Sequence, residues 1–276
     1  PLWISLLSAL TYGVGSTAWS YSISIYQHAI SAFLLISGFY AVWIYKSYPK
    51  WGILGAIYAW FSYALGAWVD YPNILILFPN IIYLLFSACQ ISNLENGINF
   101  YLKKSIIYTS LVLLIGAGAH GWYNQVTFGH WRTLSNALVR FEGSAKSQAN
   151  LSLTSEEQTL ILDKKQSATQ IFKEKYFPKG LFILLFSIDK GIFIFSPIFL
   201  ISLVAIIDSF KKFSLELVIL ISLFVVNLFV YASFGDPWGG WAYGPRYLIP
   251  SMASLSVLVG ISLWILVKKY NPLMVN

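Results

Sequence analysis

Long apolar runs are the feature that most limits what this chain can fold into. Residues 214–233 contain one charged residue, Glu216, and residues 247–267 contain none. A helix of about 20 apolar residues crosses the hydrocarbon core of a bilayer, where only helices and closed barrels satisfy their backbone hydrogen bonds. Charged residues make up 11% of the 276 residues and hydrophobic residues 57%, whereas soluble domains carry about 25% charged residues. We therefore predict an all-α polytopic membrane protein.

Eight runs of this kind predict about eight transmembrane helices. They cover roughly residues 3–19, 28–45, 52–69, 73–90, 105–121, 191–209, 214–233 and 247–267. Lysine pairs follow every second run, at Lys46 and Lys50, Lys103 and Lys104, Lys211 and Lys212, and Lys268 and Lys269. All four pairs then fall on one side of the membrane, which the positive-inside rule assigns to the cytoplasm. We expect a multi-pass plasma-membrane protein with both ends of this chain cytoplasmic.

The prediction divides the chain into three parts. Residues 1–121 hold helices one to five, residues 122–190 form an extracytoplasmic loop, and residues 191–276 hold helices six to eight. Within the loop, residues 144–176 are rich in Ser, Gln, Glu and Lys, which is typical of an exposed helix. Residues 181–186 predict a short interfacial helix. Because Pro1 leads almost at once into an apolar run, we expect this chain to begin inside a larger protein.

Charge and cysteine usage exclude several classes of site. The net charge of +7 is explained by loop lysines that suit an anionic lipid leaflet, so we expect membrane lipids and no nucleic acid as partners. Cys89 is the single cysteine and provides neither a disulfide framework nor a metal-ligand cluster. The sequence lacks a Walker loop, a dinucleotide fingerprint and the motifs of zinc and serine hydrolases. We predict no cofactor and no metal site, and the sequence does not support a divalent cation.

The stretch 235–250, between two apolar runs, concentrates side chains suited to a binding site. Arg246 carries a guanidinium, the group best suited to phosphate, and Gly244-Pro245 fix the turn that aims it. We favour anion binding over the alternative, in which Arg246 extends to lipid headgroups. The aromatic residues are Trp238, Trp241, Tyr243 and Tyr247. They suit either ordinary interfacial anchoring or contact with a sugar ring or prenyl chain, and both readings stay open.

Other side chains capable of site chemistry fall on the same predicted outer side. They are His28, His120, His130, Asp70, Asp189, Lys190 and Asp236. Their gathering at one face favours chemistry at the membrane surface, because transporters more often place ionisable groups at mid-membrane. His28 is either a hydrogen-bonded structural residue, which we favour, or a phosphate ligand. Lys190 is a candidate for a second phosphate contact.

The three aspartates also have simpler interpretations. Asp70 ends an apolar run and suits a helix cap, an ion pair with Arg246, or a base beside an acceptor hydroxyl. Asp189 can cap the sixth helix, and Asp236 fits a turn. We name them as possible supporting carboxylates and assign no catalytic residue.

Four motifs follow one another along the chain. They are Gly15-Ser-Thr-Ala-Trp-Ser-Tyr21 with Gln27-His28-Ala29, Tyr123-Asn124 with Phe128-Gly129, the stretch 185–197, and Gly239-Gly-Trp-Ala-Tyr-Gly-Pro-Arg-Tyr-Leu-Ile-Pro250. In this order they resemble the polytopic GT-C glycosyltransferases of bacteria and archaea, in the group similar to protein mannosyltransferases. The last motif is the most specific, and together the four cover most of the chain.

The resemblance implies an inverting transferase that passes a sugar from a polyprenyl-phosphate donor to a glycan, lipid or protein acceptor on the outer side. Its departing phosphate needs a cation, which Arg246 supplies, with Lys190 or His28 as helpers. The family's catalytic aspartate follows the first transmembrane helix, which we expect to precede Pro1, so this chain would lack the base. The alternatives are a transporter or flippase of lipid-linked sugars, which needs the same contacts without a base, and a non-catalytic membrane subunit.

Overall fold

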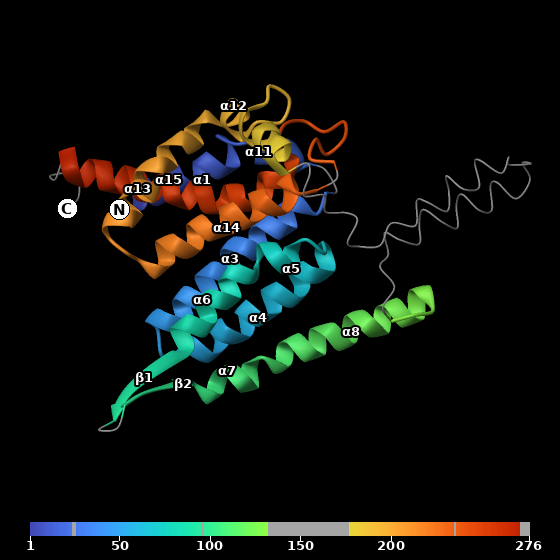
Figure 1. The fold of residues 1–276 in the computed structure, drawn as a ribbon, viewed down its shortest axis with the longest axis vertical. Coiled ribbons are helices and arrows are strands. Elements are labelled where there is room, and N and C mark those ends of the chain that lie inside the picture. The colour runs from blue at the N-terminus through green and yellow to red at the C-terminus, as the bar shows by residue number, and fades with distance from the viewer. Residues whose placement is uncertain (24–25, 95–96, 132–176, 235, 271–276) are drawn as a thin grey trace, which may run out of the picture.

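The computed structural model describes residues 1–23, 26–94, 97–131, 177–234 and 236–270 (Figure 1). Its first part contains α1 (Leu2–Gly13), α2 (Ala18–Tyr21), α3 (His28–Ser47), α4 (Gly52–Val69), α5 (Asn73–Ile76), α6 (Phe78–Ala88), β1 (Cys89–Leu94), β2 (Gly97–Leu102), α7 (Lys104–Thr109) and α8 (Leu111–Phe128). Its second part contains α11 (Phe177–Phe186), α12 (Ile192–Phe195), the 3-10 helix η3 (Pro197–Ser202), α13 (Leu203–Lys211), α14 (Leu215–Ala232), the 3-10 helix η4 (Arg246–Leu248) and α15 (Ile249–Tyr270).

Helices dominate the described residues, as the apolar runs predicted. Five helical segments there are long and apolar enough to cross a membrane: His28–Ser47, Gly52–Val69, Lys104–Phe128, Leu215–Ala232 and Arg246–Tyr270. Each coincides with a predicted span. Their length and composition are those of a helical membrane protein.

The other three predicted spans are shorter or broken. In the first of them, α1 has 12 residues and ends at Gly13, which is about 18 Å of helix against a hydrocarbon core of about 30 Å. The run 73–90 is divided between α5 and α6. The run 191–209 is divided into α12, η3 and α13, with Pro197 starting η3 because proline has no backbone N–H to continue a helix. The count of eight spans therefore stays a prediction.

A β-hairpin departs from the all-helical prediction. α6 ends at Ala88, and β1 and β2 pair antiparallel from Cys89 opposite Leu102 to Leu94 opposite Gly97. Cys89 is exposed in this hairpin and does not continue the apolar helix as the predicted span 73–90 required.

The described residues of the predicted segment 122–190 include the end of α8 and all of α11. α8 continues to Phe128 and ends on Gly129, whose φ of 77° suits a glycine helix cap. The predicted helix in residues 144–176 lies outside the described residues. The short apolar helix expected near residues 181–186 is present as α11.

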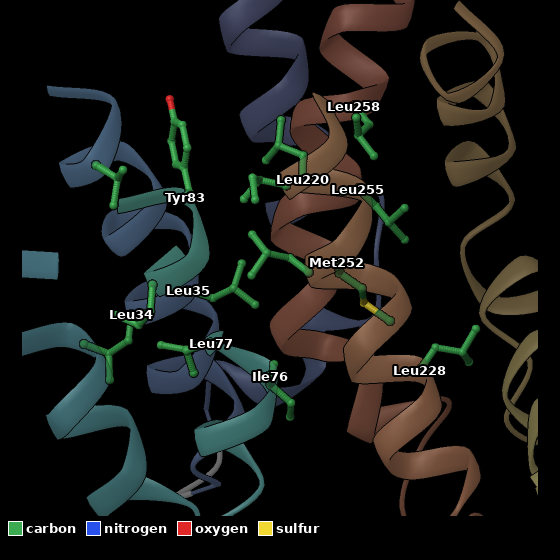
Figure 2. Close-up of a cluster of buried hydrophobic side chains, with 14 of the residues drawn as sticks. Leu34, Leu35, Ile76, Leu77, Tyr83, Leu220, Leu228, Met252, Leu255 and Leu258 are labelled. Atoms are coloured by element: carbon green, nitrogen blue, oxygen red, sulfur yellow. The ribbon is translucent and has the colours of Figure 1, made fainter. Parts of the chain in front are cut away.

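α15 lies at the centre of the bundle and packs against α1, α3, α13, α14 and η3 (Figure 1). Its small residues allow close contacts, which are the main source of helix association in lipid. Ser8 Oγ donates to the Ser256 carbonyl at 2.7 Å, and Asn227 Nδ2 donates to Ser251 Oγ at 2.7 Å. Figure 2 shows the apolar core between α3 and α6 on one side and α14 and α15 on the other. Its labelled residues are Leu34, Leu35, Ile76, Leu77, Tyr83, Leu220, Leu228, Met252, Leu255 and Leu258.

The antiparallel helices give the bundle two chemically different ends. At one end, Lys46 in the last turn of α3 forms an ion pair with Glu216 in the first turn of α14, with Nζ and Oε1 2.5 Å apart. The turn between α13 and α14 and the last turn of α15 lie toward the same end (Figure 1). The connecting residues 14–23, 70–72 and 236–245 lie at the other end (Figure 1). This second end carries the candidate site, which we call the loop end.

Candidate functional site

The stretch 236–248 enters α15 through a turn that depends on glycine. Gly239, Gly240 and Gly244 have φ angles of 67°, 66° and 58°, a left-handed region that other residues rarely adopt. A Cβ on Gly239 would lie 2.9 Å from Tyr247 Cε2 and 3.0 Å from Arg246 Nε. The loop backbone therefore lies directly against the two side chains that follow it.

Two side chains from distant parts of the sequence hold this loop by its carbonyl groups. Lys190 Nζ donates to the carbonyl oxygen of Gly240 at 3.2 Å and to that of Ala242. Tyr21 OH donates to the carbonyl oxygen of Tyr243 at 2.7 Å. Hydrogen bonds from a charged donor are stronger than neutral ones, so Lys190 is the main fastening of the loop.

The structure thus gives Lys190 a different first role from the predicted phosphate contact. Its side chain is only 6% exposed, and two of its three donors bind the loop. Burial and the neighbouring Arg246 lower the pKa of Lys190, while Asp189 and Asp236 act in the opposite direction. Both aspartates are exposed, and they balance charge around Lys190. Asp189 precedes α12 without capping it, since Gly191 occupies the N-cap.

The Arg246 guanidinium lies between aromatic rings and has no carboxylate partner among the described residues. Its Cζ is 5.3 Å from the ring centroid of Tyr26 and 5.0 Å from that of Tyr247. Its Nε is buried and finds no hydrogen-bond partner in the part of the chain that the structure describes. Among the described residues the ion pair within 4.0 Å is Lys46–Glu216 at the opposite end of the bundle. The Arg246 Nη2 donates to Tyr247 OH at 3.5 Å. A guanidinium that lacks a carboxylate among the described residues and keeps one buried donor unused is suited to bind an anion, because a buried donor without a partner is costly.

Two stacked rings, those of Tyr231 and Tyr247, connect Asp70 to this guanidinium. Asp70 Oδ2 accepts hydrogen bonds from Gln27 Nε2 at 3.3 Å and from Tyr231 OH at 3.2 Å. The Tyr231 ring stacks on Tyr247, with centroids 4.3 Å apart and planes at 4°. The direct ion pair between Asp70 and Arg246, one of the sequence-based alternatives, is therefore wrong. Burial raises the pKa of Asp70, and its hydrogen bonds partly oppose this rise.

His28 belongs to the same cluster and is 2% exposed. Its ring lies 6.1 Å from that of Tyr26 and meets Tyr247 edge-on at 6.0 Å. Its Nδ1 is buried and has no hydrogen-bond partner in the described part of the chain. From the sequence we favoured a structural histidine held by hydrogen bonds, but Nδ1 makes none among the described residues. The imidazole therefore remains a candidate phosphate ligand beside Arg246.

A polar cavity of about 490 Å³ opens beside Asp70. Its polar lining comes from Gln27, Asp70, His120 and Asn124, and its aromatic lining from Trp68, Tyr71 and Tyr123. His120 and Asn124 lie one turn apart on α8, while Trp68 and Tyr71 lie where α4 gives way to α5. The His120 ring contacts those of Trp68 and Tyr71, with centroids 5.2 Å and 6.1 Å away.

The loop aromatics do not all join the Arg246 cluster. Tyr247 does, and Tyr243 instead meets the Phe195 ring edge-on at 5.1 Å while remaining 56% exposed. Trp238 is 39% exposed, and Trp241 is fully exposed. The exposed tryptophans have the character of interfacial anchors, and neither forms a wall around the guanidinium.

Sequence reasoning missed several members of the cluster. Tyr26 and Tyr231 flank Arg246 and Asp70, but each lies next to or inside an apolar run where a tyrosine is unremarkable by itself. Gln27 was read only as part of a motif. The cavity joins α8 to the α4–α5 turn, and the sequence placed His120 on the outer side without identifying Trp68 and Tyr71 as its neighbours. Each of these side chains is identified as part of the site by a tertiary contact that the sequence alone does not predict.

Among the described residues, no group of three His, Cys, Asp or Glu side chains could hold a metal ion. Comparison with known proteins adds no assignment: no family model, curated protein or solved structure matches this chain. The likeness to GT-C glycosyltransferases therefore rests on the four sequence motifs.

Proposed function

We propose that this chain is a membrane glycosyltransferase that moves a sugar from a polyprenyl-phosphate carrier to an acceptor at the extracytoplasmic face. The observation that carries the proposal is the Arg246 guanidinium between Tyr26 and Tyr247, which has no carboxylate partner among the described residues. It lies in the motif that most resembles the GT-C enzymes.

The chemistry assigns Arg246 to the leaving group. The acceptor oxygen bonds to the anomeric carbon, the bond from that carbon to the phosphate oxygen breaks, and its electron pair stays on the phosphate. A fixed cation stabilises the growing negative charge, an effect worth about 10²- to 10³-fold in rate for one donor in comparable sites. His28 lies beside the same rings and suits a second donor, while Lys190 keeps the loop in place. The acceptor proton needs a base, which we assign to no residue of this chain.

The two ends of the bundle support the proposed orientation. The lysine pairs favour the cytoplasmic side for one end, and the Arg246 cluster belongs to the loop end opposite. With eight spans, the donor phosphate would bind at the extracytoplasmic membrane surface, and its polyprenyl chain would lie among apolar helices.

Transfer assays on Arg246 variants test the proposal. Membranes containing the complete protein, supplied with radiolabelled polyprenyl-phosphate sugars, should transfer label to an endogenous acceptor. Arg246→Ala should lower the transfer rate about 10²- to 10³-fold, and Arg246→Lys should recover part of it because lysine keeps the charge but lacks the forked donors. Lys211→Ala, exposed at the opposite end, is the matched control.

Normal transfer by Arg246→Ala would refute the phosphate-binding role. A protein that moves labelled lipid across the bilayer without transferring sugar would instead be a flippase. That outcome is measured by following access of an added periodate reagent to the lipid-linked sugar in sealed vesicles.

A further inference from the structure

We infer that the cavity beside Asp70 binds a neutral, hydroxyl-bearing sugar ring. The inference rests on the proposed function for the source of that sugar, because both the donor and the acceptor of a glycosyltransferase can carry one. The residues that support it are distinct from the Arg246 phosphate contact.

The size and lining of the cavity define the ligand. Its volume of about 490 Å³ falls within the range of about 300–1,000 Å³ typical of small-molecule sites. The polar lining offers a carboxylate at Asp70, amides at Gln27 and Asn124, and an imidazole at His120. These groups accept and donate hydrogen bonds to hydroxyls in both directions.

The aromatic lining of the cavity narrows the chemical class of the ligand further. The rings of Trp68 and Tyr71 both contact the His120 ring. Trp68 is still 41% exposed, so part of its surface is open to a ligand. A pyranose ring packs its C–H face on such aromatic rings, and the hydroxyls at its rim form hydrogen bonds with the polar lining. A lipid chain cannot form hydrogen bonds with these polar groups. An anion is disfavoured because the one charged group lining the cavity is a carboxylate.

The hydrogen bonds of Asp70 show how it would serve this site. Gln27 and Tyr231 donate to Oδ2, which fixes the carboxylate at the cavity wall. A carboxylate so fixed is an acceptor already oriented for a sugar hydroxyl, which reduces the cost of binding. Tyr231, which donates to Asp70, stacks on Tyr247 of the Arg246 cluster, so these two rings link the proposed sugar site to the phosphate site.

Ligand-detected saturation-transfer NMR tests the inference directly. The complete protein is placed in nanodiscs, because maltoside and glucoside detergents would themselves compete. Methyl α-glycosides of the common hexoses serve as probes, and at least one should show saturation transfer that a second, spectroscopically distinct hexoside suppresses by competition. Asp70→Asn, whose amide oxygen still accepts from Tyr231, and His120→Phe, which keeps an aromatic ring, should weaken binding about tenfold or more. Leu114→Ala, exposed on the same helix as His120, should leave binding unchanged.

A photoreactive hexoside supplies a second measurement, independent of affinity. Its label should map to peptides containing Trp68, Tyr71 or Tyr123. Failure of all glycosides to bind, together with label elsewhere, overturns the inference, even if transfer itself is intact. Specific binding in a protein without transfer activity would retain the cavity assignment and refute the transferase.

Polyprenyl-phosphate sugar distinguishes the two sources. If it displaces the bound glycoside, the cavity takes the donor's sugar. If both bind together, the cavity takes the sugar of the acceptor. Either result supports the sugar site.

Discussion

Replacing Gly239 and Gly240 one at a time separates the cost of a strained backbone from the cost of disturbing the site. Both glycines have nearly the same positive φ, 67° and 66°, so alanine at either position costs about 1–2 kcal/mol in backbone conformation. At Gly240 the added methyl group meets nothing within 4 Å. At Gly239 it would lie 2.9 Å from Tyr247 Cε2 and 3.0 Å from Arg246 Nε.

The difference between the two variants therefore measures packing against the guanidinium cluster. Overpacking of this kind costs about 1–3 kcal/mol, which corresponds to about a 5- to 150-fold change in an equilibrium constant. Hydrogen-exchange mass spectrometry of peptides covering residues 236–248 should show that Gly239→Ala opens faster than Gly240→Ala by this factor. In the transfer assay, Gly239→Ala should lose most activity and Gly240→Ala should retain most of it.

Equal exchange rates in the two variants would refute this reasoning. They would mean that Tyr247 and Arg246 move aside at no cost, so that the loop does not hold them in one arrangement. A larger loss of activity in Gly240→Ala would place the functional contact on the outer face of the loop, near Trp241.

Two further predictions concern the charged neighbours of this loop. Lys190→Met removes two hydrogen bonds to loop carbonyls, which costs about 2 kcal/mol after relief of the buried charge. Hydrogen exchange of residues 236–248 should therefore become about 30-fold faster. The control Lys211→Met should leave exchange unchanged, and unchanged exchange in Lys190→Met would show that other contacts hold the loop. Burial raises the pKa of Asp70 above 3.8, so the folded protein binds this proton more tightly than the unfolded chain, and ionisation costs stability above that pH. Asp70→Asn should therefore melt at a higher temperature than the parent at pH 7, and the gap should shrink as the pH falls toward 3.8; a gap that widened on acidification would contradict the sign.

The sequence predicted those parts of the fold that depend on apolar length alone. The runs that form α3, α4, α14 and α15 needed no tertiary information, because about 20 apolar residues without charge have few other uses. The run 191–209 looked similar but contains Pro197, and the structure breaks it there. The hairpin at Cys89–Leu102 was missed because its first residues continue an apolar run.

The candidate site was predictable only in part, for a related reason. Arg246 was identified because a guanidinium among glycines and aromatic residues is conspicuous in an apolar chain. Tyr231, by contrast, is one of 18 tyrosines, and only its position beside Asp70 and Tyr247 distinguishes it. Lys190 was predicted on the same side as the loop and as a phosphate contact, whereas its hydrogen-bond partners in the structure are loop carbonyls 50 and 52 residues away. Long-range polar contacts of this kind leave no periodic signal in the sequence.

The central position of α15 has a consequence for how the protein is made. The helices that pack on α15 leave the ribosome before it: they are α1, α3, α13 and α14. The hydrogen bond from Ser8 to Ser256, 248 residues later in the chain, can form only after α15 has been synthesised. Until then, Asn227 and the serines that face α15 lie in lipid or against provisional partners. Assembly of the bundle is therefore late and cooperative. Until α15 emerges, membrane insertases and quality-control proteases would meet a bundle whose interior is still open.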